Sequence, residues 1–489
     1  MGERHTRREF VRRGSAAVLI ASTPALLPAS APAAPTTAEL RRRLRGSLVT
    51  PRDEGWAAAR ALYNPRLDVE PRAIAFCEST ADVAHVVRFA RARGWPVAAR
   101  GGRHSFAGYS NAVGGIVADV SRIDAVTLED DRPVARIGGG ANVLDVYREL
   151  VLGHGRALPV GTCPTVGIAG LTLGGGFGRL MRRYGVTSDR LRGATVVLAD
   201  GRVVRCAEGR RADLFWALRG GGAGTAIVTQ LRFAVGAAPQ GPIAFTLSYP
   251  WSRAAAAIDA WQRTLPDAPV TLSYGRLRAL RRPNGALTLT ASGHWYGSET
   301  ALLALLAPLL AAGPARQTLR RRTFAQAALP DSVELRGGGP VIVDPPQFPN
   351  HQRSDFFSGL LPPAAIAALL AQIERWPGVG GGGHEGGVQL DALGGAVNRP
   401  QPAATAFVHR RQRLHCAYLS FWGASDPPAM AAACEQWTRT GAARRGSRAS
   451  TARTRRPSPA DRSRPRSSGR RSAGAGGGAR TRSRPAAAG

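Results

Sequence analysis

No lysine occurs in this sequence: all 66 residues of the Lys and Arg type are arginine. Only 33 Asp and Glu oppose them, which gives a net charge of +33. With 59 Gly and 35 Pro among 489 residues, this composition indicates a GC-rich coding bias more than selection for a basic binding surface. It excludes a coiled coil, a collagen, a disulfide-dense miniprotein and a wholly disordered chain. The length predicts two or three domains.

Large apolar residues are missing from the last 52 residues, 438–489, which contain no Val, Ile, Leu, Met, Phe, Trp, Tyr or Cys. The same stretch holds fifteen arginines and one acidic residue, Asp461, so it carries +14. Such a segment cannot bury enough apolar surface to offset chain entropy, and it is predicted to be disordered. Two origins stay open: an out-of-frame translation of a GC-rich gene, or a genuine basic tail that binds nucleic acid or an anionic surface.

Apolar runs long enough to cross a membrane are also missing. The run at 14–27 follows the pair Arg7-Arg8 and precedes small residues with A-x-A cleavage sites. This order is typical of a signal peptide, with a membrane anchor as the alternative. The arginine pair resembles the twin-arginine signal, an address for the export of folded proteins. Residues 1–33 are therefore predicted to be a twin-arginine signal peptide, with the twin-arginine export machinery as partner and a periplasmic or extracellular destination.

Cysteine is scarce, and its five positions are an odd number: Cys77, Cys163, Cys206, Cys416 and Cys434. In an exported protein, at least one of them is then not paired with another cysteine of the chain. No metal site is predicted.

Strands and helices alternate over residues 66–238. Strands are predicted at 73–77, 97–100, 116–120 and 135–137, helices at 80–94 and 143–150, and a hairpin around Asp200-Gly201. Glycine clusters follow several strands, where backbone N–H groups approach a pyrophosphate closely because no Cβ intervenes. Plain turns explain such clusters about equally well in a glycine-rich chain. Their spacing is not that of a Rossmann dinucleotide fingerprint.

Five glycine-containing motifs then follow one another along the chain. They are Arg100-Gly-Gly-Arg-His104-Ser105, Gly161-Thr-Cys163-Pro-Thr-Val-Gly167, Leu173-Gly-Gly-Gly-Phe-Gly178, Arg183-Tyr-Gly-Val186 and Asp213-Leu-Phe-Trp-Ala-Leu-Arg-Gly-Gly-Gly222. The series resembles the FAD-linked oxidoreductases of the berberine-bridge-enzyme type, whose flavin domain is the PCMH-type domain shared with vanillyl-alcohol oxidase. The resemblance implies an α+β fold, with a PCMH-type FAD-binding domain at 66–238. A substrate domain of antiparallel sheet backed by helices is implied at 239–437, its C-terminal part missing.

The same resemblance implies that His104 bonds the flavin ring methyl and that Cys163 bonds ring carbon 6. Imidazole and thiolate are good nucleophiles toward an electron-poor isoalloxazine, and two tethers raise its redox potential and orient it. The alternatives are a satisfied loop histidine and a small buried thiol. The expected FAD-binding set is His104, Cys163, Arg100, Gly101, Gly102, Arg103, Ser105, Gly161, Thr162, Gly167, Gly174 and Gly175. Arg103 stands where the family usually has glycine, so that its side chain either reaches a phosphate or crowds the loop.

The catalytic residue is less clearly marked. Plant members place a glutamate before the tyrosine of a late strand, but this chain has Ala417 before Tyr418, and the Tyr-x-Asn-Tyr segment of other members is absent. Among Tyr418, His409 and Asp391, Tyr418 is the predicted flavin-facing catalytic candidate, with a half-buried packing residue as the alternative. His415 is expected at the surface.

The predicted function is FAD-dependent oxidation of an alcohol or amine-bearing carbon of a sugar or secondary metabolite. Electrons would pass to molecular oxygen or another acceptor, and a base would take the hydroxyl proton. A small-molecule substrate is expected, with no nucleic-acid partner and no stable membrane insertion. Two alternatives are a flavin-binding chain without turnover, owing to the lost segment and Ala417, and a nucleic-acid or anionic-surface binder acting through the tail.

Overall fold

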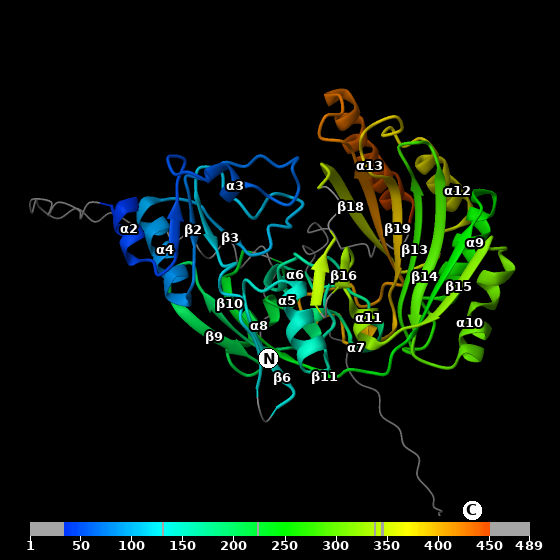
Figure 1. Cartoon of the computed structure of the whole chain (residues 1–489), viewed down its shortest axis with the longest axis horizontal. Coiled ribbons are helices and arrows are strands. Elements are labelled where there is room, and N and C mark those ends of the chain that lie inside the picture. Colours follow the sequence, from blue (N-terminus) through cyan, green and yellow to red (C-terminus); the bar gives the residue numbers. More distant parts are fainter. Residues whose placement is uncertain (1–33, 130–131, 223, 337–338, 344–346, 450–489) are drawn as a thin grey trace, which may run out of the picture.

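The computed structural model describes residues 34–129, 132–222, 224–336, 339–343 and 347–449, with only the backbone described for 442–449. Two domains lie side by side, the first blue to green and the second green to orange in Figure 1. The predicted α+β fold, with an FAD-binding domain and a substrate domain built on a large antiparallel sheet, is confirmed. The predicted signal peptide at 1–33 and most of the predicted tail lie outside the described residues.

The first sheet of the first domain has the strand order β1-β2-β4-β3, with β2, β4 and β3 parallel. Helix α4 packs on it, starting where Ser79 accepts a hydrogen bond from the Asp82 amide and ending at Gly94, whose φ is +63°. Strand β1 pairs with β2, so the domain begins well before Arg66, the start expected from the motifs. The bounds are α2 Thr37–Arg43, β1 Ser47–Val49, α3 Trp56–Arg60, β2 Ala73–Phe76, α4 Thr80–Arg93, β3 Val97–Arg100 and β4 Ile116–Asp119.

The second sheet of this domain is antiparallel, in the order β5-β6-β10-β8-β9, and the hairpin predicted at Asp200-Gly201 joins β8 to β9. Its strands are β5 Val126–Leu128, β6 Val134–Gly138, β8 Leu191–Val197, β9 Val203–Ala207 and β10 Ile227–Ala234. The accompanying elements are α5 Val143–Val146, a π-helix Tyr147–Gly153, β7 Arg156–Ala157, α6 Ile168–Leu173, α7 Met181–Tyr184, a 3-10 helix Thr187–Arg190, α8 Ala212–Ala217 and β11 Gly236–Ala237.

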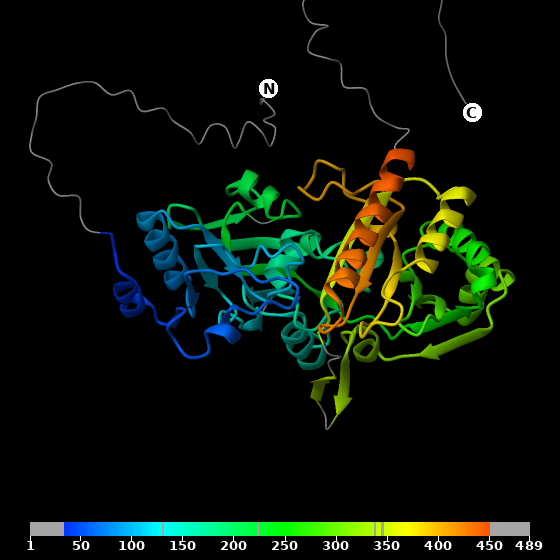
Figure 2. The ribbon, with the colours of Figure 1, turned by 90° about the horizontal axis from the view of Figure 1, so that it is seen from above.

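A seven-stranded antiparallel sheet forms the second domain, in the order β15-β12-β14-β13-β19-β20-β18. Helices α9, α10 and α12 cover the face turned away from the first domain, and α13 lies against β18 and β20 (Figures 1 and 2). The strands are β12 Ile243–Tyr249, β13 Leu272–Arg281, β14 Leu287–Trp295, β15 Arg316–Arg321, β18 Asn350–Phe357, β19 Gly386–Ala392 and β20 Leu414–Phe421. The helices are the 3-10 helix Trp251–Arg253, α9 Ala254–Thr264, α10 Glu299–Ala311, α12 Pro363–Glu374, the 3-10 helix Gly395–Asn398 and α13 Pro428–Ala449.

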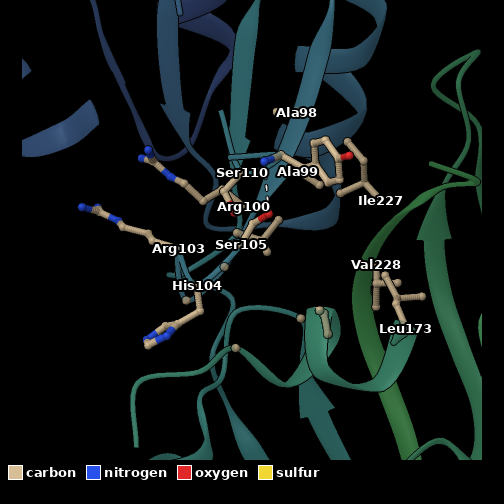
Figure 3. A pocket seen from close by; sticks show the side chains of 18 of the residues that line it. Ala98, Ala99, Arg100, Arg103, His104, Ser105, Ser110, Leu173, Ile227 and Val228 are labelled. Atoms are coloured by element: carbon tan, nitrogen blue, oxygen red, sulfur yellow. Dashed lines mark hydrogen bonds between the residues drawn. The ribbon is translucent and has the colours of Figure 1, made fainter. Parts of the chain in front are cut away.

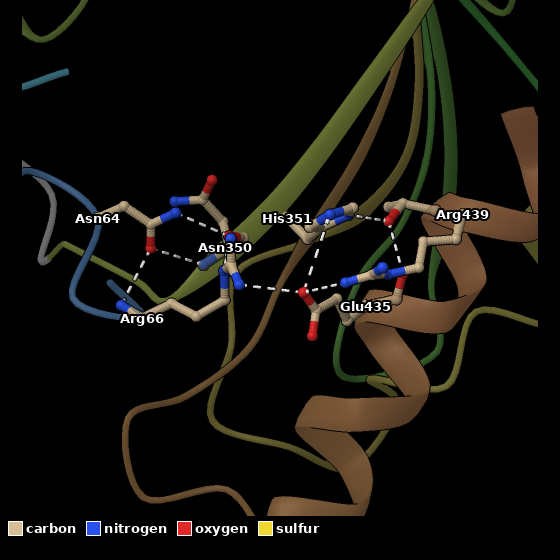
Figure 4. A network of polar contacts seen from close by, with 7 residues as sticks. Asn64, Arg66, Asn350, His351, Glu435 and Arg439 are labelled. Carbon is tan, nitrogen blue, oxygen red and sulfur yellow. Dashed lines mark hydrogen bonds and ion pairs between the residues drawn. The ribbon is translucent and has the colours of Figure 1, made fainter. Parts of the chain in front are cut away.

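The segment that contains α11 Phe324–Ala328, β16 Val333–Arg336 and β17 Gly339–Ile342 ties the second domain to the first. Tyr147 donates its hydroxyl to the Ala325 carbonyl at 2.8 Å, and the Asp331 amide donates to the Thr162 carbonyl at 2.6 Å. A polar network makes a second tie, in which Arg66 of the first domain bonds Glu435 of α13 at 3.0 Å (Figure 4).

Helix α13 corrects the predicted start of the disordered tail at Thr438. Thr438 is fully buried and its hydroxyl bonds His351, while Trp437 packs in the core of the domain. The helix continues to Ala449 because these side chains anchor it to β18. The expectation of disorder for 450–489 falls outside the described residues. Within the described ranges, no helix is long and apolar enough to cross a membrane.

Candidate functional site

A cavity of about 1070 Å³ opens in the first domain where β3 ends (Figure 3). Its wall is made by the loop after β3, the loop before α6, α6 itself and the start of β10, and three residues of β18 and β20 reach it from the second domain. Eight residues of the predicted FAD-binding set line it: Arg100, Gly101, Gly102, Arg103, His104, Ser105, Cys163 and Gly167. The strand-end glycine loops therefore meet around one space, as the motifs predict.

Gly102 explains how the two motif loops come together. A Cβ at this position would lie 2.3 Å from the Gly167 amide nitrogen and 2.4 Å from the Thr165 carbonyl oxygen. Both are backbone atoms that cannot move aside, so only glycine permits this approach. The contact fixes the loop of His104 against the loop of Cys163.

His104 is held from two sides within the cavity wall. Its ring stacks on Tyr63, with the ring centroids 3.7 Å apart, and its Nε2 lies 2.8 Å from the Thr165 hydroxyl. Burial lowers the pKa of His104 to about 4, because the charged imidazolium loses its hydration there. The ring is therefore neutral at pH 7 and nucleophilic. With Nε2 bonded to Thr165, Nδ1 is the nitrogen available for another bond.

Cys163 differs from the other cysteines of the chain. None of the five forms a disulfide, and four are buried in the protein core, whereas Cys163 is half-exposed in the cavity wall. Burial raises the pKa of Cys77, Cys206 and Cys434, which keeps those thiols protonated. Cys163 is thus the thiol of this chain that a molecule in the cavity can reach.

Two arginines flank the same loop and behave differently. Arg100 is buried and pairs with Asp119 at 2.5 Å and with the Asn111 side chain at 3.0 Å. Its Nη2 has no hydrogen-bond partner among the described residues, so a buried donor remains for a bound group. Arg103 has a φ of +63°, the conformation that glycine favours, and donates to the Ala58 carbonyl at 3.2 Å. Its side chain leaves the loop uncrowded at the cost of a strained backbone.

Four residues of the predicted FAD-binding set do not line this cavity, and their role stays a prediction. Gly161 and Thr162 line a small neighbouring cavity beneath the loop. At Gly175 a Cβ would lie 2.6 Å from the ring of Phe407 of the second domain, whereas at Gly174 the nearest atoms would be carbonyl oxygens of α6, 3.6 Å or more away. The glycine at 175 therefore permits close contact between the domains.

The wall also contains residues that the motifs did not reveal. They include Tyr63, Trp95, Ala199, Ile227, Val228, Asn350, Gln352 and Phe421. Of these, only Val228 and Ile227 follow a glycine run, and the others lie in segments without a motif. Gly139, from the run Gly138-Gly139-Gly140, also lines the cavity. It packs against the backbone of Val228, another wall residue, where a Cβ would lie 2.3 Å from the Val228 carbonyl oxygen.

The sheet of the second domain has two distinct faces. Leu414, Cys416 and Tyr418 of β20 pack in the core beneath the helices, whereas Phe421 points to the cavity. Since side chains alternate along a strand, His415 and Ala417 share the face of Phe421. Tyr418 is fully buried on the helix side, which corrects its assignment as a flavin-facing residue. His415 is only 14 % exposed, which corrects its expected place at the surface.

On this cavity-side face, polar residues stand directly opposite one another on neighbouring strands. Arg276 of β13 pairs with Asp391 of β19, and Asp391 pairs with His415 of β20. The side chains are in contact: Arg276 Nε is 2.8 Å from Asp391 Oδ1, and His415 Nδ1 is 3.3 Å from Asp391 Oδ2. Burial would raise the pKa of Asp391, but Arg276 and His415 hold it well below its usual range, so it is ionised.

Comparison with known proteins identifies the family. Residues 71–207, which hold both His104 and Cys163, match the family described as FAD binding domain. The chain is 33% identical to the uncharacterized FAD-linked oxidoreductase YgaK of Bacillus subtilis (strain 168), a match that covers 78% of this chain and 82% of that protein. This chain belongs to the FAD-linked oxidoreductases.

Two sugar oxidases are also similar to this oxidoreductase. Chitooligosaccharide oxidase of Gibberella zeae is 32% identical, over 73% of this chain and 72% of that protein. A structure of glucooligosaccharide oxidase from Acremonium strictum, a protein with a 6-S-cysteinyl, 8α-N1-histidyl FAD, has a TM-score of 0.69 and 28% identity. That match covers 78% of this chain and 82% of the other.

The residues of the oxidoreductase cavity fit FAD. The cavity is long enough to run from Trp95 and Ala199 to Gln352, and its volume suits a large cofactor. Nη2 of Arg100, which has no partner among the described residues, provides a donor, and Gly101 and Gly102 bring backbone to the cavity wall. A neutral imidazole and an accessible thiol lie at the same wall. The lining of the cavity thus agrees with the FAD-linked family to which the chain belongs.

Proposed function

We propose that this oxidoreductase oxidises an alcohol carbon of an oligosaccharide and holds its FAD covalently through His104 and Cys163. The observation that carries the proposal is that the one half-exposed cysteine and a neutral histidine line the same cavity. The glucooligosaccharide oxidase similar to this chain has an FAD named for one cysteinyl and one histidyl bond.

When bound, FAD accepts a hydride from the substrate carbon and passes the electrons to oxygen or another acceptor. The chain holds it with Arg100 and the glycine loops, and Thr165 and Tyr63 fix the ring of His104. Asn350, Gln352 and Phe421 reach the cavity from the second domain, so the substrate would enter between the two domains.

The sheet face above the cavity supports a hydroxyl-rich substrate. Besides Arg276, Asp391 and His415, the same face carries hydrogen-bonding side chains in register on four strands: Thr290, Ser292, Arg278, Gln389, Ser354 and Gln352. Apart from Arg278 these are neutral donors and acceptors, and at strand spacing they suit the hydroxyl groups of linked sugar rings. The two sugar oxidases similar to this chain support the same class of substrate.

The test is anaerobic mixing of purified holoprotein with cellobiose, N,N′-diacetylchitobiose and xylobiose, followed by flavin absorbance. We expect at least one of them to bleach the flavin band, and readmission of air to restore it. Dithionite is the control that shows a reducible flavin, and benzylamine is the control for amine oxidation. Flavin that dithionite bleaches but no oligosaccharide does would contradict the proposal and favour a flavin-binding chain without turnover.

We also propose that the protein is exported through the twin-arginine route, with Arg7 and Arg8 as the signal. Replacing both by lysine keeps the charge but removes the arginine pair. Cell fractionation should then find the variant in the cytoplasm, still carrying flavin, and the parent protein outside it. Equal export of both proteins would overturn this route.

A further inference from the structure

We propose that His415, oriented by Asp391, is the base that takes the hydroxyl proton of the substrate. The inference rests on the proposed function, alcohol oxidation, and adds to it the residue that makes the hydroxyl reactive. The sequence motifs point to Tyr418 of the same strand and not to this histidine.

The orientation of the imidazole follows from the charge of Asp391. Arg276 keeps this buried carboxylate ionised, and Gln389 donates a further hydrogen bond to it at 3.0 Å. An ionised carboxylate only accepts hydrogen bonds, so His415 must carry its proton on Nδ1, the nitrogen 3.3 Å from Asp391. Nε2 then holds the lone pair that a base needs.

The position of His415 places this lone pair between the domains. Its ring packs against Phe177, with centroids 5.3 Å apart, and against Phe356, with centroids 5.0 Å apart. Phe177 belongs to the first domain and follows the glycine run at 174–176. The two phenyl rings pack against the imidazole, and 14 % of the side chain remains exposed.

The polar row is also connected to the cavity wall. The charge of Asp331 acts on Arg276 and on Tyr274 of the same sheet face. The Asp331 amide in turn bonds the carbonyl of Thr162, the residue directly before Cys163. Asp331 therefore links the row to the loop that carries Cys163.

Other groups in this region lack the same properties. Tyr418 is on the opposite face, under the helices. Burial raises the pKa of Tyr274, so its phenol stays protonated. His294 has no carboxylate contact in the described structure, and its Nδ1 is buried without a partner. His409 stacks flat on Phe356 at 3.7 Å and does not contact Asp391.

The proposed step is balanced. As the carbon–hydrogen bond of the substrate breaks, its hydride carries two electrons to FAD, and the O–H proton passes to Nε2 of His415. The carbon–oxygen bond becomes a carbonyl, and the imidazolium that forms is stabilised by Asp391. The acceptor of the proposed function, oxygen or another oxidant, later removes the two electrons, and His415 returns its proton to solvent.

The experiment compares His415→Ala with His409→Gln, a change at the neighbouring histidine, in anaerobic stopped-flow reduction by cellobiose or whichever probe bleaches the parent flavin. His415→Ala should slow reduction 10²–10⁴-fold, and added imidazole should restore part of the rate. The acid-side fall of the parent rate should vanish in His415→Gln and remain in His409→Gln. The charged or titratable groups near His415 are Asp391, Arg276 and His409. The comparison with His409→Gln therefore shows which of the two histidines causes the pH dependence.

A second measurement does not depend on turnover. ¹⁵N NMR of the imidazoles should show His415 with its proton on Nδ1, and Asp391→Asn should change this tautomer while leaving His104 as it is. A His415 proton on Nε2 would overturn the proposal, as would an unchanged reduction rate in His415→Ala. If no oligosaccharide reduces the parent flavin, the proposed function is wrong, and the role of His415 with it. If an oligosaccharide reduces the flavin of the parent and of His415→Ala at the same rate, the proposed function stands and only the role of His415 is excluded.

Discussion

The imidazole of His104 stacks on the phenol ring of Tyr63, 3.7 Å between centroids and 26° between planes, while Thr165 holds its Nε2. Three segments far apart in the sequence thus fix one ring. Tyr63 belongs to a loop whose next residues, Asn64 and Arg66, bond the second domain. The orientation of the proposed flavin anchor therefore depends on both domains.

Thr165→Val should slow covalent attachment at His104, because valine keeps the shape of threonine but removes the hydroxyl that occupies Nε2. We expect a severalfold lower rate of histidyl attachment, with attachment at Cys163 unchanged. Digestion and mass spectrometry of protein reconstituted with FAD measures each bond separately. Thr127→Val, on an exposed strand position, is the control. Equal loss at both sites would contradict a specific role for Thr165.

Arg103→Gly should stabilise the apoprotein. Arg103 has a φ of +63°, which costs about 1 kcal/mol in a residue with a Cβ and nothing in glycine. The hydrogen bond lost to Ala58 is exposed and offsets part of the gain. We expect a net gain of about 0.5 kcal/mol in urea unfolding. Arg42→Gly, at an exposed position of α2, should instead cost about 1 kcal/mol. A lower free energy of unfolding in Arg103→Gly would show that the contacts of the Arg103 side chain stabilise the protein by more than its backbone conformation costs.

His294 should make the protein less stable in acid. Burial, with Arg179 and Arg322 nearby, lowers its pKa to about 3, against about 6.5 in an unfolded chain. Below pH 6.5 the unfolded chain therefore binds a proton that the folded protein does not. The free energy of unfolding should fall with decreasing pH between about 6.5 and 3, by at most about 1.4 kcal/mol per pH unit.

The measurement is the melting temperature of the parent and of His294→Gln between pH 4.5 and 7. The melting temperature of the variant should fall less on acidification than that of the parent. At pH 7 the variant is less stable than the parent if glutamine packs worse than histidine. His104 contributes in the same direction through its pKa of about 4, so the slope should decrease without disappearing. Parallel curves for the two proteins would exclude His294 as a source of acid sensitivity.

Glu435→Gln should loosen the loop that carries Tyr63. Glu435 bonds Arg66 at 3.0 Å and Arg439 at 2.8 Å, and both Arg66 and Glu435 are about one quarter exposed (Figure 4). We expect faster hydrogen exchange at residues 62–67 and a cost to stability of about 1 kcal/mol or less. Glu299→Gln removes an exposed carboxylate 3.7 Å from Arg321 and is the matched control. Unchanged exchange would mean that α13 does not hold this loop.

The flavin side of the site could be predicted from the sequence because its signals are local. A strand followed directly by Arg100-Gly-Gly-Arg-His104 fixes the loop, the strand end and the histidine within six residues. The requirement for glycine at Gly102 arises from another such motif, the loop of Cys163. Where the loop of His104 meets the loop of Cys163, the motifs and the structure agree.

The substrate side could not be predicted in the same way. Alternation along β20 separates Tyr418 from His415, but it does not say which face the helices cover. The role of His415 becomes visible only with its cross-strand partner Asp391, 24 residues before it, and with Arg276 a further 115 residues away. Likewise, Gly175 faces Phe407 of the other domain, a contact that no local pattern contains.

The most direct test of the whole account is acid precipitation of the holoprotein, followed by flavin fluorescence of the pellet and peptide mapping. We predict that parent protein keeps its flavin, that His104→Ala and Cys163→Ser each keep it through the remaining bond, and that the double variant loses it. The peptides of the parent should carry the flavin on both residues. Parent protein that releases all its flavin into the acid, or a double variant that retains it, would contradict the account.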